Sequence, residues 1–119
     1  MSGQVPETSS GDELFEMAHL YPRTTGLPMT VRVSPRGNAR HDVQIKVNMT
    51  HGNNMVIDNT AVVAVRPSPH MIAGRLSAED QQTVFKWVSL NAKTIAAYWD
   101  GDIDTIELSQ MLEPLAPAS

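Results

Sequence analysis

In two runs between residues 28 and 66, 29–33 and 41–49, apolar side chains recur at every second position, and this period restricts the fold more than any other feature. Such alternation is typical of β-strands that bury one face and leave the other in solvent. Gly, Pro and Asn clusters between the alternating runs indicate turns. The predicted strands are 29–33, 41–49, 55–57 and 61–65, and the predicted turns are 35–38 and 51–54. The segment therefore predicts an antiparallel meander of three or four strands, in which the wholly apolar run 61–65 is central or covered.

The hydrophobic period changes to that of an α-helix after Ser77. Ser77 is followed three residues later by Asp80, a pattern typical of a helix N-terminus. The apolar residues that follow form a stripe wide enough to cover one face of a sheet. They are Val84, Val88, Ile95 and Trp99, flanked by Phe85, Trp87, Ala92 and Tyr98. Gly101 is expected to end this long helix.

Two shorter helices are expected near the ends of the chain. Ser10 to Glu13 matches a capping box and predicts a helix over about 11–20, and Asp104 with Glu107 predicts another over 105–113. The first would turn Leu14, Phe15, Met17 and Ala18 toward the body of the protein.

These elements together predict the domain organisation. The polar residues 1–9 are expected to form a disordered tail. The sequence then predicts a single α+β domain over 10–115, with the long helix covering one face of the meander.

Composition removes several classes of protein. The chain has no cysteine, which excludes disulfide scaffolds, thiolate catalysis and cysteine-based metal sites. The longest apolar run, 61–65, is far too short to span a membrane. The first residues are neither basic nor apolar, as a signal peptide would be. We therefore expect a cytoplasmic protein without a membrane partner.

Charge is distributed unevenly along the chain. Residues 1–20 carry four acids and no Lys or Arg, 21–75 have a net charge of +5, and 76–119 have a net charge of −5. The basic middle could contact the phosphates of a nucleic acid. Its strands, however, contain no aromatic residue on which a base could stack. The favoured interpretation is that basic strands and acidic helices neutralise each other, within the chain or across a dimer.

No motif for catalysis or cofactor binding is present. The histidines His19, His41, His51 and His70 lack the short spacings of metal-binding pairs. A site formed by His41, Asp42 and His51 at strand ends is retained as an alternative. Residues 100–104 resemble the start of a calcium loop, but Thr105 and Met111 stand where that loop needs Gly and Glu. We predict no catalytic residue, no metal site and no cofactor.

The helical half carries a resemblance to a known family. Residues 73–77 read Ala-Gly-Arg-Leu-Ser and are followed by Val84, Trp87, Asn91 and Trp99. This segment resembles the C-terminal part of the short bacterial proteins called domain of unknown function 4160. Compared with that family, the usual Pro-Pro-His-x-His cluster is reduced to His41, and Ser77 stands where Pro is common. The resemblance implies a small α+β protein, encoded beside a second small protein in an arrangement like toxin–antitoxin pairs, and implies no established activity.

The sequence therefore predicts a non-enzymatic module that binds a protein partner or a second copy of itself. A nucleic-acid-associated regulator is the first alternative, and a small metal-dependent enzyme centred on His41 is the second. The residues predicted to form the interaction surface are Arg32, Arg36, Arg40, His41, Lys46 and Trp87.

Overall fold

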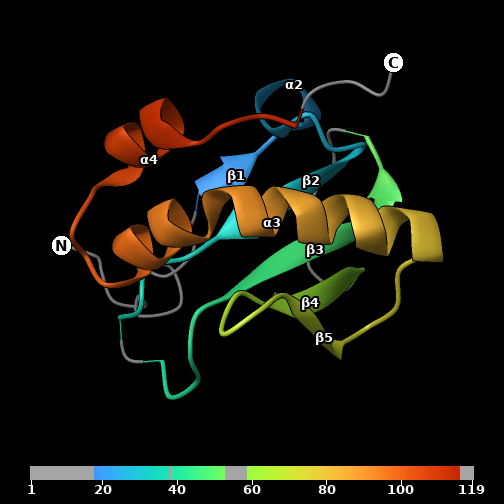
Figure 1. Cartoon of the computed structure of the whole chain (residues 1–119), viewed down its shortest axis with the longest axis horizontal. Coiled ribbons are helices and arrows are strands. Elements are labelled where there is room, and N and C mark those ends of the chain that lie inside the picture. Colours follow the sequence, from blue (N-terminus) through green and yellow to red (C-terminus); the bar gives the residue numbers. More distant parts are fainter. Residues whose placement is uncertain (1–17, 38, 53–58, 116–119) are drawn as a thin grey trace, which may run out of the picture.

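The computed structural model describes residues 18–37, 39–52 and 59–115. One antiparallel sheet contains five strands in sequence order, and one face of it is crossed by a long helix (Figure 1). The strands are β1 (Ala18–Leu20), β2 (Met29–Val33), β3 (Gln44–His51), β4 (Thr60–Ala64) and β5 (His70–Ala73). The helices are α2 (Pro22–Thr25), α3 (Ala78–Trp99) and α4 (Thr105–Met111). This arrangement confirms the predicted α+β class and the long helix over the sheet.

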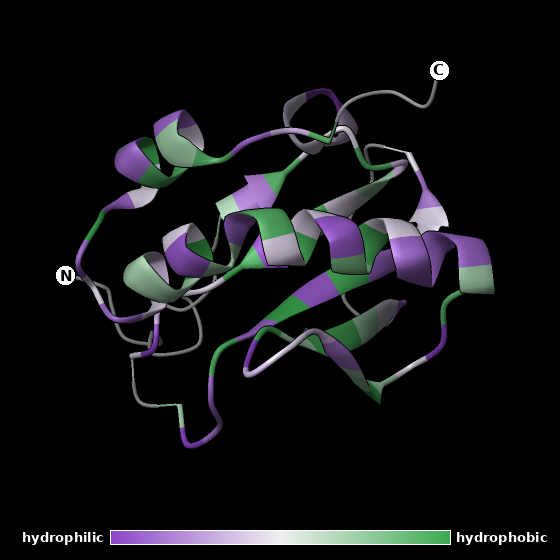
Figure 2. Cartoon of the chain, viewed as in Figure 1, coloured by the Kyte–Doolittle hydropathy of each residue, from purple (hydrophilic) through white to green (hydrophobic). Residues whose placement is uncertain are grey.

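The hydrophobic core lies between the sheet and α3. Antiparallel pairing brings Val33 next to Ile45 and Ile45 next to Val63, so their side chains share one face. Val88 and Ile95 of α3 belong to the same core cluster, and all five side chains are fully buried. Hydrophobic and hydrophilic residues alternate along α3 (Figure 2), as expected for a helix with one buried side. Burial of each such side chain stabilises the folded state by roughly 1.5–3 kcal/mol.

The N-terminal helix predicted over 11–20 is wrong for its last three residues, which form β1. Leu20 pairs with Val31 of β2, and Ala18 and Leu20 are buried while His19 between them is exposed. Burial alternates along these three residues, and the edge of β2 next to them offers backbone groups for pairing. Both favour a strand here over the helix that the capping signal indicated. The rest of that predicted helix, the tail 1–9 and the strand predicted at 55–57 lie outside the described residues.

Strand β5 was not anticipated by the sequence pattern. It has four residues between Pro69 and Gly74, and among residues 18–37, 39–52 and 59–115 its pairing partner is β4. Its pairing places β4 between β3 and β5, which confirms that the apolar run at 61–65 is central.

The helix ends follow the capping signals. The Ser77 side chain accepts a hydrogen bond from the backbone N–H of Asp80 at 3.1 Å. Asp104 and Glu107 form a reciprocal capping box at the start of α4. After α4, the buried amide of Asn91 holds the chain by donating to the carbonyl of Glu113 and accepting from its N–H. These contacts place the C-terminal segment beside α3.

Gly74, between β5 and α3, occupies a position that only glycine fits. Its φ is +79°, and a Cβ there would lie 2.6 Å from the Cα of Ala61 on β4. Gly101 has a similar φ of +83°, but no atom lies within 4 Å of a Cβ built on it. Substitutions at Gly74 and Gly101 can therefore distinguish the cost of a side chain in this backbone conformation from the cost of its overlap with neighbouring atoms.

We predict that Gly74→Ala lowers the free energy of unfolding by about 2–4 kcal/mol, because strain and overlap with β4 add. Gly101→Ala should lower it by only about 1 kcal/mol, since it carries the strain alone. Urea denaturation followed by far-UV circular dichroism measures both. Equal losses in the two variants would contradict the close approach of Gly74 to β4.

Candidate interaction surface

The six residues predicted to form an interaction surface do not lie together. Trp87 is 0% exposed in the core and Arg32 is 3% exposed on β2, so neither is accessible to a partner in this conformation. Lys46 is half-buried on β3, opposite Arg32. Arg40 and His41 are exposed in the loop between β2 and β3, together with Arg36. Only this loop matches the predicted surface.

The prediction that β2 has one face in solvent is wrong, because all five residues of β2, Arg32 included, are buried. In the sheet it lies between His19 of β1 and Lys46 of β3. Its Nε has no hydrogen-bond partner within the described part of the chain. Burial lowers the pKa of Arg32, and burial together with the charge of Arg32 lowers the pKa of His19.

The β2–β3 loop is held against the end of α3. The backbone N–H of Arg36 donates to the carbonyl of Trp99 at 2.9 Å. The imidazole of His41 lies against the Trp99 indole, with ring centroids 5.4 Å apart, and its Nδ1 donates to the carbonyl of Asp42 at 2.8 Å. These contacts fix His41 as part of the packing around the helix end.

Part of the basic charge is neutralised within the chain. The guanidinium of Arg66 donates to both carboxylate oxygens of Asp42, at distances between 2.8 and 3.1 Å. This contact is the main cause, ahead of a hydrogen bond from the backbone of Val43, that lowers the pKa of Asp42 from 3.8 to about 2, and it raises the pKa of Arg66. Asp100 also raises the pKa of Arg66 through its negative charge. Because Asp42 and Arg66 both belong to the basic segment 21–75, their pairing leaves its net charge of +5 unchanged and does not test whether the acidic helices neutralise the basic strands.

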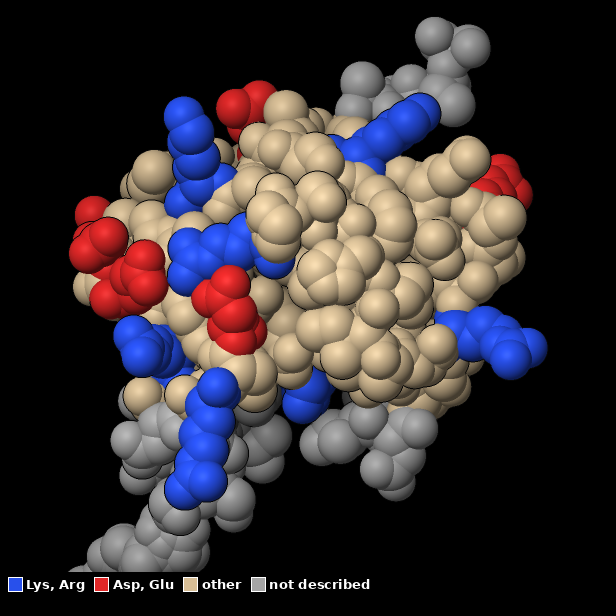
Figure 3. Space-filling model, turned by 60° about the horizontal axis from the view of Figure 1, so that its bottom comes forward, with Lys and Arg blue, Asp and Glu red and all other residues tan. Residues whose placement is uncertain are grey.

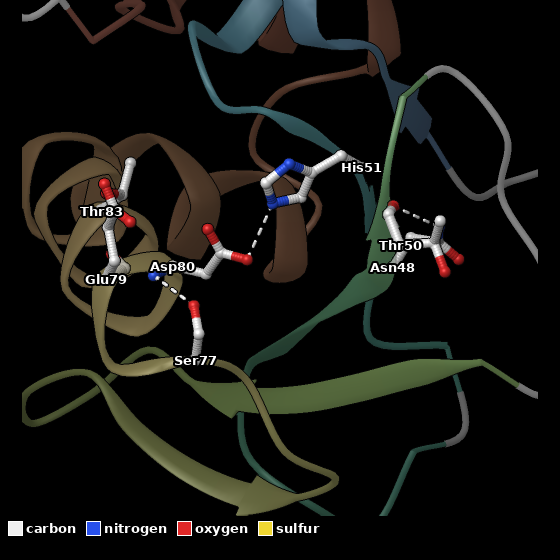
Figure 4. A network of polar contacts seen from close by, with 7 residues as sticks. All are labelled: Asn48, Thr50, His51, Ser77, Glu79, Asp80 and Thr83. Carbon is white, nitrogen blue, oxygen red and sulfur yellow. Dashed lines mark hydrogen bonds and ion pairs between the residues drawn. The ribbon is translucent and has the colours of Figure 1, made fainter.

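The alternative site formed by His41, Asp42 and His51 is not assembled. His41 lies before β3 and His51 ends it, and the eight residues of β3 span about 26 Å. His51 instead pairs with Asp80 in the first turn of α3, Nε2 to Oδ2 at 2.8 Å (Figure 4). No group of three or more His, Cys, Asp or Glu within residues 18–37, 39–52 and 59–115 could hold a metal ion.

A largely apolar surface lies at the opposite margin of the fold from β1, where β5 forms the sheet edge. Ile72 of β5 is 53% exposed and Leu90 of α3 is 47% exposed. An open groove that includes Leu90 is also lined by Pro69, Phe85, Lys86 and Ser89. Figure 3 turns this side forward and shows a broad area free of charged side chains, with both signs of charge around its margins.

We call this the β5 surface and define it as Pro69, Ile72, Ala73, Phe85 and Leu90. Sequence reasoning missed it, although two signals were present. Residues 67–73 contain no Lys, Arg, Asp or Glu, and Leu90 falls outside the apolar stripe of the long helix. The first marks an uncharged segment and the second an apolar residue on the outer side of the helix.

Comparison with known proteins identified no relative of this chain. No family model matches the chain, and searches of curated proteins and of solved structures found no match. The resemblance to domain of unknown function 4160 therefore stays a prediction. None of the described helices combines the length and apolar character required to cross a bilayer.

The Asp42–Arg66 pair predicts a specific pH response. Because the pKa of Asp42 is lowered on folding, its contribution to stability is complete above about pH 4 and disappears as the pH falls toward 2. Arg66→Gln should return the pKa of Asp42 toward 3.8, as measured by NMR titration of its side-chain carboxyl carbon. Arg36→Gln is the matched control and should change that pKa much less, since Arg36 acts on Asp42 only through distant charge. An unchanged Asp42 pKa in Arg66→Gln would contradict the pairing.

Proposed function

We propose that this chain is a non-enzymatic protein-interaction module and that it binds through the β5 surface. The observation that supports the proposal is the exposure of Ile72 and Leu90 at this margin of the fold, together with an open groove at Leu90 and a broad area without charged side chains. Apolar area surrounded by charged side chains is the composition of many protein interfaces.

The backbone of β5 adds a second means of binding. Within the described residues β5 pairs with β4 alone, so its other edge presents N–H and C=O groups that a further strand can pair with. Main-chain pairing would provide affinity, and the groove beside α3 would select an apolar side chain. The partner is a protein, either a second copy or, as the resemblance implies, the product of a neighbouring gene. The cytoplasmic location expected from the sequence stays a prediction.

Ile72→Lys should reduce capture of a protein partner by the full chain at least tenfold, because it would replace the exposed apolar side chain of the edge strand β5 with a charged one. The matched control is Ile106→Lys on α4, since Ile106 is 68% exposed and lies outside this surface. Pull-down from native cells with equal amounts of the folded proteins measures the effect. Equal capture by wild type and Ile72→Lys would overturn the assignment of the surface, and no capture together with a monomeric protein would overturn the function.

A nucleic-acid-associated regulator remains the second candidate, favoured by one observation. Arg36 and Arg40 are exposed, and neither makes a hydrogen bond to an acidic side chain within the described residues. Against it, Arg32 is buried and Arg66 is already paired with Asp42. The candidate therefore depends on the β2–β3 loop.

If this second candidate is correct, Arg36→Glu/Arg40→Glu should weaken salt-sensitive binding to single-stranded or duplex DNA at least tenfold. Lys86→Glu/Lys93→Glu makes the same change in net charge on α3 and should leave binding unchanged. Fluorescence anisotropy at several salt concentrations provides the measurement. Wild-type affinity in the loop variant, or no salt-dependent binding by the wild type, would exclude the candidate.

A further inference from the structure

We infer that the occupant of the β5 surface is a second copy of this chain, whose β5 pairs antiparallel with the first. The inference rests on the proposed function and names its partner. In such a dimer, two five-stranded sheets would join at their β5 edges around a two-fold axis.

The absence of charge on β5 favours self-pairing in particular. In a symmetric antiparallel pair, each residue faces a residue of the same strand, so a charged side chain near the axis would meet its own copy. Strand edges commonly carry such charges, Lys above all, because they prevent this contact. Residues 67–73 contain no Lys, Arg, Asp or Glu, and with a two-fold axis at residue 71 or 72 their one titratable side chain, His70, would face Ile72 or Gly74 and not its own copy.

The side-chain pairs in this arrangement bury what is now exposed. Residues directly opposite in an antiparallel pair lie on the same face of the sheet. Ile72 would therefore face either Ile72 or His70 of the second copy, and Met71 would face Met71 or Ala73. In both registers the side chain of Ile72, now 53% exposed, would be covered.

The charges at the two ends of β5 are compatible with this reversal. Arg66 precedes β5 and Glu79 follows it in the first turn of α3, and both are exposed. Reversing the second strand brings the Arg66 end of one copy beside the end of the other that carries Arg75 and Glu79. Arg66 is already paired with Asp42, and Arg75 and Glu79 have opposite signs, so this end does not set like charges against each other. Because charges of both signs surround the β5 surface, we expect no net electrostatic repulsion between two copies that meet there (Figure 3).

The test begins with the oligomeric state of the full chain. Sedimentation equilibrium of the wild type should give a concentration-dependent mass approaching twice 13.0 kDa. Ile72→Lys should raise the dimer dissociation constant at least tenfold, whereas Ile106→Lys should leave it unchanged. Circular dichroism and thermal melting confirm that each variant is folded.

Crosslinking then identifies the contact. Because the chain has no cysteine, Ile72→Cys introduces the single thiol of the protein, and Ile106→Cys provides the same thiol at a remote exposed site. A short bismaleimide should link Ile72→Cys into a covalent dimer and should not link Ile106→Cys. A dimer that resists Ile72→Lys, or that links equally from both sites, would overturn the inference.

The outcomes distinguish this inference from the proposed function. A dimer dissociation constant of about 1 mM corresponds to a binding free energy of only about 4 kcal/mol. A wild type that stays monomeric up to about 1 mM therefore overturns self-pairing. If that monomer still captures a protein in a manner abolished by Ile72→Lys, the proposed function stands and the second copy is excluded. If it captures nothing, both are excluded.

Discussion

Burial of one face of the sheet beneath α3 is the interaction on which the rest of the structure depends. Val33, Ile45 and Val63 come from three different strands, and their side chains reach the core only if those strands are paired in register. A shift of one residue would turn each of them to the opposite face. Covering this face with α3 therefore determines the register of the central strands, the direction of the helix and the faces available for binding.

The sequence predicted the elements in which local pattern and long-range packing agree. Strand β2 was recognisable from alternation, and the ends of α3 and α4 from their capping residues, because these signals act within a few positions. Strands β1 and β5 are short, and each is stabilised mainly by the strand next to it. The sequence near Ser10 indicated a helix, but a free edge on β2 was a stronger constraint on Ala18–Leu20 than the propensity of the segment.

The interaction surface was less predictable because exposure and pairing depend on residues far away in sequence. Alternation correctly separated Arg32 from Val31 and Val33, but it does not reveal whether the polar face of a strand is covered. Arg66 and Asp42 are 24 positions apart, so their pairing follows from the β3–β4 register and not from charge counting. Trp87 is an aromatic residue at a core position of α3, and because Trp87 and Arg32 are both buried and Lys46 is half-buried, the exposed candidates are those of the β2–β3 loop.

The largely apolar surface at β5 follows from the widths of the elements. Five strands at about 4.8 Å spacing span about 19 Å, whereas one helix with its side chains covers about 10–12 Å. On the β1 side, the remaining area is covered by α4 and the segment after it: Leu108 and Leu112 join the core, and the backbone N–H of Leu115 donates to the carbonyl of Thr25, the last residue of α2. On the β5 side, no described element performs this role, and Phe85 is left only partly buried beside the groove. A single helix over a five-strand sheet thus leaves one margin incomplete, and a second molecule that pairs with β5 would complete it.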